Sequence, residues 1–419
     1  MKLTLKKIID LQTLLIWVGL FCVVSFAMVE HMSIPIPEIS SIKMPLVLVG
    51  GLCVIPQLKL FLVNVFKKRY FAIFLILLTL CGFLLFSMKY NSDTVSGYSP
   101  ERNTIRLVLY LLELFILMMV FSERGQSHAV ISFVYGYVLL IVILTDVFMF
   151  TRLVTFGTER LPYYLVGTKF TVVYRHLDLL VLWLIRNWER REDRSVNKLF
   201  LWSAAIVVIL VSVYVDCMSG VLGCAFLVWL ILQQNASKKL TKLLSTPALL
   251  VLCILVCTLV AFVIGFILDI PFVTGLIEDV LRRDTTLTGR IKIYQNYTDA
   301  MEGHWFFGYG FGSGNTVSLQ YFGCTNAQNA VLHWVLQCGL IITTLMISLF
   351  ALIMKQVKTH PQNWKGAREL LVVLVYTYIV LGIVEITYSM SFILFMALLF
   401  MLANDKKATD SSVKTQIAT

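Results

Sequence analysis

The stretch "LQTLLIWVGLFCVVSFAMV", residues 11–29, carries no charged side chain. A membrane-spanning helix needs about 20 consecutive apolar residues, because each residue adds about 1.5 Å and the hydrocarbon layer is about 30 Å thick. The basic stretch "MKLTLKK" comes before it, but the apolar run is too long for a signal peptide and has no small-residue cleavage site. We therefore predict a membrane helix that stays in the protein.

Stretches of the same kind recur along nearly the whole chain of 419 residues. Hydrophobic residues make up 58% of the sequence and charged residues only 14%, and the mean hydropathy is +0.83. Soluble domains carry about a quarter charged residues, so the composition indicates an all-α, polytopic membrane protein. About twelve spans are expected, near residues 11–29, 44–63, 70–88, 105–121, 129–150, 170–187, 199–215, 219–233, 247–268, 329–354, 370–388 and 391–403.

These spans divide the chain into four parts. Residues 1–268 hold the first nine predicted helices, 269–328 form a large connection, 329–403 hold the last three helices, and 404–419 form a tail. The side with both termini carries roughly twice as many Lys and Arg residues as the other, and the richer side is usually cytoplasmic. The large connection is then external. This bias accounts for most of the net charge of +11, which suits membrane lipids and requires no nucleic-acid partner.

The connection 269–328 is too rich in aromatic residues for a disordered segment. Its part "EDVLRRDTTLTGRIKIYQNYTDAMEGHW", residues 278–305, has the pattern of an amphipathic helix. Two interpretations are open. The helix lies on the membrane with its arginines on lipid phosphates, or Arg282, Arg283, Arg290 and Lys292 bind a diphosphate, because guanidinium groups contact phosphate oxygens in pairs.

Glycines and amides follow this basic segment. Glycine occupies every second position from Gly308 to Gly314, and on physical grounds a tight turn is favoured over a phosphate loop, because no strand-to-helix context surrounds them. Asn326, Gln328 and Asn329 then stand directly before an apolar span. Amides at this place indicate a polar cavity at the outer boundary of the membrane.

A second polar group lies around the sixth span. Lys169 stands at its outer start, and Arg175, His176 and Asp178 lie within it. Charges at such depth face a cavity or each other, and Arg175 and Asp178, three residues apart, are also placed to pair. The sequence contains no cluster of His, Cys and carboxylates at metal-ligand spacing, so no metal site is predicted.

The order of these motifs resembles the O-antigen ligase and polymerase superfamily. "TLTGR" (286–290), Trp305, "FGYGFGS" (307–313) and "NAQNAVLHWVLQCGL" (326–340) occur in the order of that superfamily's [ST]GR, G-x-G and HNxxL…G motifs. "YLVGTKF" (164–170) is similar to a segment of Wzy-type polymerases from capsule and exopolysaccharide clusters. Gln328–Asn329 stands where the family often has His-Asn.

The resemblance implies a GT-C-like, metal-independent, inverting glycosyltransferase that uses no cofactor. It would act on polyprenyl-diphosphate-linked oligosaccharides at the outer face of a bacterial cytoplasmic membrane, with flippase and chain-length regulator proteins as partners. Arg290 matches the motif arginine, and Lys169 or Arg175 would be the second cation at the diphosphate. The remaining expected substrate-binding residues are Arg282, Arg283, Asn296, Asn326, Gln328 and Asn329 for polar contacts, and Trp305 and Tyr309 for stacking on sugars.

Three functions are compatible with this pattern. A glutamine in place of the motif histidine accepts no proton, which favours a polymerase over a ligase and leaves the general base unassigned. A ligase would be favoured if His304 or His333 reached the cavity. A polysaccharide flippase or other transporter would need a water-filled path through the membrane and no large external connection.

Overall fold

The computed structural model describes residues 2–29, 39–96, 98–151, 155–156, 161–162, 164–188, 198–268, 290–360 and 364–406. The described chain is helical apart from a short antiparallel pair, β1 (Thr155–Phe156) with β2 (Leu161–Pro162). The helices are α1 (Lys2–Val29), α2 (Ile39–Val54), η1 (Ile55–Gln57), α3 (Leu58–Val65), α4 (Lys68–Tyr90), α5 (Glu101–Arg124), α6 (Ser127–Thr151), α7 (Lys169–Trp188), α8 (Lys198–Tyr214), α9 (Met218–Ala236), α10 (Lys238–Leu244), α11 (Pro247–Leu268), α13 (Arg290–Ala300), α14 (Gly314–Phe322), α15 (Ala330–Thr359), α16 (Lys365–Leu381) and α17 (Met390–Ala403).

Within these residues, seven segments are long and apolar enough to cross a membrane: α1, the α2–α3 segment, α4, α5, α6, α9 and α15. An eighth is present if α10 and α11, which meet at a bend of 71°, count as one span. The other expected spans coincide with α7, α8, α16 and α17, which are shorter or more polar. A multi-pass helical protein is therefore confirmed, whereas the count of twelve is not.

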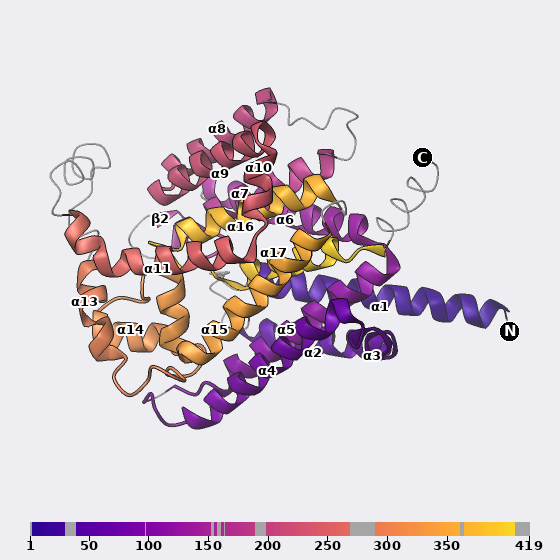
Figure 1. The fold of residues 1–419 in the computed structure, drawn as a ribbon, viewed down its shortest axis with the longest axis horizontal. Helices are drawn as coiled ribbons and strands as arrows, with labels where there is room; N and C mark the ends of the chain where they lie inside the picture. The colour runs from indigo at the N-terminus through magenta and orange to yellow at the C-terminus, as the bar shows by residue number, and fades with distance from the viewer. Residues whose placement is uncertain are drawn as a thin grey trace.

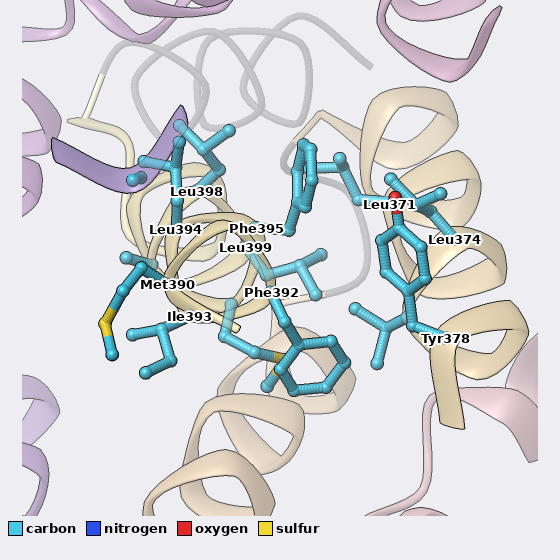
Figure 2. Close-up of a cluster of buried hydrophobic side chains, with 14 of the residues drawn as sticks. Leu371, Leu374, Tyr378, Met390, Phe392, Ile393, Leu394, Phe395, Leu398 and Leu399 are labelled. Atoms are coloured by element: carbon cyan, nitrogen blue, oxygen red, sulfur yellow. The ribbon is translucent and has the colours of Figure 1, made fainter. Parts of the chain in front are cut away.

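Helix α17 forms the centre of the bundle. All of its residues are buried, and its sequence "MSFILFMALLFMLA" is apolar on every side, which is typical of a helix surrounded by other helices. It packs against α1, α5, α15 and α16. Figure 2 shows its side chains pointing outward in several directions, with Phe392 and Phe395 toward Tyr378 and the leucines of α16. By contrast, α2, α4 and α8 expose large apolar side chains, which suit contact with lipid.

The connections between the helices gather at two opposite ends of the bundle. One, here called the loop end, contains residues 301–329 and the connections 91–100, 164–168, 215–217 and 382–389, which hydrogen bonds and ion pairs link to one another. The other, here called the tail end, contains the connections 66–67 and 125–126, the end of α15, the start of α16, and residues 404–406. Helices α13 and α14 lie at the end of the molecule away from the N terminus (Figure 1).

The described part of the large connection is an ordered helical unit with its own core. Ile293, Tyr294, Tyr297 and Ala300 share one face of α13 and are buried with residues of α14 and the start of α15. The expectation of an ordered, amphipathic segment is thus confirmed for residues 290–300, and the apolar face of α13 packs against protein, including α11 and α14. Residues 269–289, which include Arg282 and Arg283, lie outside the described residues.

Helix α15 is broken at Gly339, whose φ is +74° and ψ is 176°. The glycine-containing loop lies against this break: Leu340 N–H donates to the Trp305 carbonyl at 2.8 Å, and Tyr309 N–H donates to the Leu336 carbonyl at 3.0 Å. A Cβ on Gly339 would lie 2.2 Å from the Phe306 carbonyl oxygen. The break therefore requires glycine, and the loop provides the hydrogen bonds that the helix itself loses.

The alternating glycines of the loop have conformational roles as well. Gly308, Gly310 and Gly312 have φ values of +62°, +92° and +92°, in the left-handed region that disfavours other residues. A Cβ on Gly312 would lie 2.2 Å from the Tyr98 hydroxyl. The glycines thus form close turns, as the turn interpretation predicted, and they bring the loop against the connection 91–100.

Candidate functional site

The amides before α15 mainly hold its start in place. Asn329 is 1% exposed, and its Oδ1 accepts hydrogen bonds from the N–H groups of Val331 and Leu332 at 3.1 Å each. Its Nδ2 donates to the Ile383 carbonyl at 3.3 Å. Asn329 is therefore an N-cap, and it also ties α15 to the connection between α16 and α17.

The two other amides form the turn that leads into this cap. Asn326 Oδ1 accepts from Gln328 N–H at 2.9 Å, and Gln328 has a positive φ of 50°. The Tyr294 hydroxyl lies 3.0 Å from the Gln328 carbonyl and 3.4 Å from that of Ile383. The side chains of Asn326 and Gln328 remain half-buried. They are thus better placed than Asn329 to meet a ligand.

Arg290 is the first residue of α13 and stands one helical turn before Tyr294. Since Tyr294 contacts the backbone of Gln328 and Ile383, the start of α13 lies close to the amide turn. The Arg290 side chain lies outside the part of the chain described in atomic detail. Asn296, on the same helix, is half-buried.

The two aromatic residues expected to stack on sugars differ in accessibility. Trp305 is half-buried, with its ring centroid 6.2 Å from that of Tyr297. Tyr309 is 5% exposed, stacks on His304 at 3.8 Å, and donates to the Ala300 carbonyl at 2.5 Å. Burial raises the pKa of Tyr309 above its ordinary value. Trp305 is thus the more accessible of the two, and Tyr309 serves the packing of the loop.

Arg175 lies in a buried polar cluster between α7, α16 and α17. Its Nη1 is 2.5 Å from Asp178 Oδ2, and its Nη2 donates to Ser391 Oγ at 3.0 Å. The other Asp178 oxygen accepts a hydrogen bond from the Tyr378 hydroxyl. Arg175 is 4% exposed and Asp178 is fully buried. The structure therefore contains the pairing that the sequence left open as one alternative.

Lys169 is paired as well, but near the surface. Its Nζ donates to the Asp216 carbonyl at 2.7 Å and lies 3.1 Å from Asp216 Oδ2. The neighbouring Cys217 thiol is close enough to Glu385 and Lys169 to interact with both charges, although burial is the main cause that raises its pKa. His176 Nε2 lies 3.3 Å from Asp146 Oδ2. The start of α7, at the loop end, thus carries opposite charges side by side.

One segment, residues 382–391, links the amide turn, α13 and the polar residues of α7. It consists of the connection between α16 and α17 and the first two residues of α17. Its Ile383 carbonyl binds Tyr294 of α13 and the Asn329 cap. Its Ser391 hydroxyl binds Arg175, and Glu385 lies near the Lys169 pair. Groups far apart in the sequence therefore meet around one short segment at the loop end. This segment, with the side chains around it, is the candidate site.

Sequence reasoning missed a further polar group at the loop end. Arg106 of α5 is 9% exposed, and its Nη1 lies 3.4 Å from Asn103 Oδ1. Asn103 Nδ2 donates to the Tyr98 hydroxyl at 2.8 Å, which donates to the Phe311 carbonyl at 2.8 Å. The signal in the sequence is an arginine at the first apolar turn of a predicted span, but the charge count assigned it to the external connection.

The groups described at the candidate site are side chains and backbone groups of the protein. No cluster of three or more His, Cys, Asp or Glu residues suited to a metal ion occurs within the described residues. Comparison with known proteins gives no match: no protein-family model fits the chain, and neither curated proteins nor solved structures show a significant similarity to it.

Proposed function

We propose that this chain is a polymerase of surface polysaccharide. It would transfer a growing glycan from polyprenyl diphosphate to a lipid-linked repeat unit at the outer face of a bacterial cytoplasmic membrane. The proposal includes about twelve spans in a GT-C-like arrangement, cytoplasmic termini and an external loop end. It rests on the motif order that resembles the O-antigen ligase and polymerase superfamily.

The structural observation that supports the proposal most is the meeting of the motif-bearing segments at residues 382–391. The first half of α7 is separated by more than a hundred residues of sequence from the start of α13, which bears the motif arginine, and from the amide turn before α15. All contact the same connection. A glycosyltransferase needs this arrangement, because donor, acceptor and leaving group must be held together for the transfer.

The residues present suit a transfer from a diphosphate. The anomeric carbon would lose its bond to the diphosphate oxygen and form one to the acceptor hydroxyl oxygen, with inversion. The proton of that hydroxyl would pass to the leaving diphosphate or to water, because no general base is assigned. Negative charge then grows on the diphosphate, and fixed cations in a site with little water stabilise it without reorganisation. Arg290 is the proposed main cation, Lys169 and Arg175 flank it, and Asn296, Asn326, Gln328 and Trp305 would hold the sugars. Arg282 and Arg283 are proposed to act at the diphosphate too.

A ligase is the second candidate function, and one observation favours it. His333 lies on the first turn of α15 and packs against the backbone of Gly314, where an added Cβ would be 2.5 Å from its Cε1. An imidazole therefore lies one helical turn from Asn329. A ligase would transfer finished glycan to an acceptor other than a lipid-linked repeat unit.

The decisive experiment is chain extension by the purified full chain in proteoliposomes. Lipid-linked repeat units extracted from cells of the source organism that lack the gene would be the substrate. A ladder of products that differ by one repeat unit supports the polymerase. Transfer in a single step to a different acceptor indicates the ligase. Movement of the lipid-linked unit across the bilayer without a new glycosidic bond indicates a flippase, and both latter outcomes contradict the proposal.

Orientation provides a separate prediction. Gln320 of α14 and Asn235 of α9 are both exposed, and they lie at the loop end and the tail end respectively. In cells, a single cysteine at position 320 should react with an impermeant maleimide, whereas one at 235 should react only after permeabilisation. A background without the native cysteines makes the assay specific. Labelling of position 235 in intact cells would reverse the proposed topology.

A further inference from the structure

Arg106 is a buried cation with little compensation from the protein. It is 9% exposed, and within the described residues its one hydrogen bond is the long one to Asn103. Its Nε and Nη2 make no hydrogen bond with the described part of the chain, and no ion pair found there includes it. A buried, unpaired charge is costly, and an intramembrane or boundary charge of this kind generally marks a functional site.

Arg106 lies beside the candidate site. It stands one helical turn before Tyr110, whose hydroxyl donates to the Met390 carbonyl at 2.9 Å. Met390 starts α17, and the next residue, Ser391, binds Arg175. Tyr110 from α5 and Arg175 from α7 therefore bind the same first turn of α17, and Arg106 stands one helical turn from Tyr110. Arg106 is also linked through Asn103 and Tyr98 to the glycine loop.

The surroundings of Arg106 favour an anion. Arg175 and Lys169 each have a carboxylate within 3.1 Å, so part of their charge is already balanced. Arg106 lies near the N-terminal, positive end of α5, which favours a bound anion there. The buried hydroxyl of Thr104 also has no hydrogen-bond partner within the described residues. Donors are thus abundant, and no ion pair within the described residues joins Arg106 to a carboxylate, although Glu101 stands in the first turn of α5.

We propose that Arg106 binds a phosphate group carried by a membrane lipid. Its guanidinium would contact two phosphate oxygens through Nε and Nη2, the geometry in which arginine differs from lysine. If the proposed function holds, this phosphate belongs to the polyprenyl diphosphate of the substrate. The structure then assigns a diphosphate-binding residue to α5, which is separated from the large connection by six helices along the chain.

The test is direct binding of polyprenyl diphosphate to the full chain in nanodiscs of phosphatidylcholine. Arg106→Gln should weaken binding about tenfold or more, because a charge-assisted contact is lost. Arg106→Lys should recover only part of the loss. Arg102→Gln, an exposed position one turn earlier, is the matched control and should change binding less than about threefold. Thermal unfolding should show that Arg106→Gln is at least as stable as the unaltered chain.

Two further ligands separate the sources of the phosphate. Inorganic pyrophosphate tests the anion alone, and phosphatidylglycerol in the nanodisc tests an ordinary lipid headgroup. Competition by pyrophosphate that Arg106→Gln abolishes supports the proposal. Equal binding of polyprenyl diphosphate by Arg106→Gln and the unaltered chain overturns it. Loss of phosphatidylglycerol binding alone overturns the substrate assignment.

A carboxylate of the same chain that pairs with Arg106 would also overturn the proposal. Glu30 and Glu38 are the first and last residues of the connection 30–38, which lies outside the described residues. If Arg106→Gln lowers the unfolding temperature and a second change, Glu30→Gln or Glu38→Gln, restores it, Arg106 is part of an ion pair. The polymerase proposal is tested separately: Arg106-dependent binding without chain extension would refute the polymerase and leave the phosphate site standing.

Discussion

Helix α5 carries one buried charged side chain near each end, and the two differ in how far neighbouring charges compensate them. At the tail end, Glu123 is 2% exposed and accepts from Arg69 and from the Tyr70 hydroxyl at 2.8 Å. Lys406 lies 2.5 Å from its other oxygen. At the loop end, the one partner of Arg106 among the residues that the structure describes is neutral, Asn103.

The difference separates a structural cluster from a site prepared for a ligand. The tail-end cluster continues from Arg69 through Gln356 to Asn404, so it joins α4, α5, α15 and the end of α17. Such a network of paired charges and hydrogen bonds holds helices together. At the loop end, the uncompensated charge costs stability, and proteins tolerate such a cost mainly where a functional site requires it. The predictions below test this distinction.

Removal of the tail-end carboxylate should have the largest effect. Glu123→Ala leaves several cations and the fully buried Tyr70 hydroxyl without an acceptor, and breaking a buried ion pair costs about 3–5 kcal/mol. Thermal or chemical unfolding in detergent measures the loss. Lys406→Ala is the control, because that side chain is 48% exposed and such pairs contribute about 1 kcal/mol or less. Similar small losses for both variants would contradict the structural interpretation of this end.

Arg290 should affect catalysis at the loop end with little effect on folding. Arg290→Ala removes the proposed main cation at the leaving diphosphate, which should slow chain extension about a hundredfold, or about 3 kcal/mol in the transition state. Arg290→Lys keeps the charge but not the paired geometry, so most activity should stay lost. Polymer length and amount at matched protein levels are the measurement. Near-normal polymer from the alanine variant would leave Arg290 with the role of a lipid contact.

Asn329 should show a smaller effect, on stability. Asn329→Ala removes the N-cap of α15 and the bond to Ile383, which should cost about 1–2 kcal/mol in the free energy of unfolding. Asn329→Ser keeps a capping oxygen and should recover most of that loss. If chain extension per folded molecule falls strongly in both variants, Asn329 contacts the substrate and the cap is only part of its role.

Much of the fold followed from local sequence patterns. Apolar runs predicted the helices, and alternating glycines predicted tight turns. The alternation of apolar residues such as Ile291, Ile293 and Tyr294 with basic residues predicted an amphipathic helix, of which α13 is the described part. Each of these depends on neighbouring residues alone. The pairing of Arg175 with Asp178 was one of two alternatives for the same reason, since residues three apart meet on a helix.

The rest depended on contacts between distant segments or on a signal that was overlooked. The break of α15 at Gly339 depends on hydrogen bonds with a loop about thirty residues earlier. The role of residues 382–391 depends on contacts with four separate helices, α5, α7, α13 and α15. Burial of Tyr309 against His304 likewise needs the folded loop. Asn329 was recognisable, because an asparagine directly before an apolar helix is a common N-cap, yet its amide was assigned to the substrate.

The smallest expected effect concerns divalent ions, and it tests the cations of the loop end as a group. Many glycosyltransferases use a divalent ion to balance the charge of the leaving diphosphate. In the proposed mechanism Arg290, assisted by Arg106 and the flanking pairs of Arg175 and Lys169, has this role, and the sequence contains no cluster with ligand spacing for a metal. Chain extension by proteoliposomes should therefore continue at an essentially unchanged rate after treatment with a chelator and extensive washing. The control is a glycosyltransferase of known metal dependence in the same vesicles, which must lose its activity. If chain extension stops and only a divalent ion restores it, the arginines alone do not stabilise the leaving diphosphate. The difference between the two ends of α5 would then give no support to a catalytic role for the loop end.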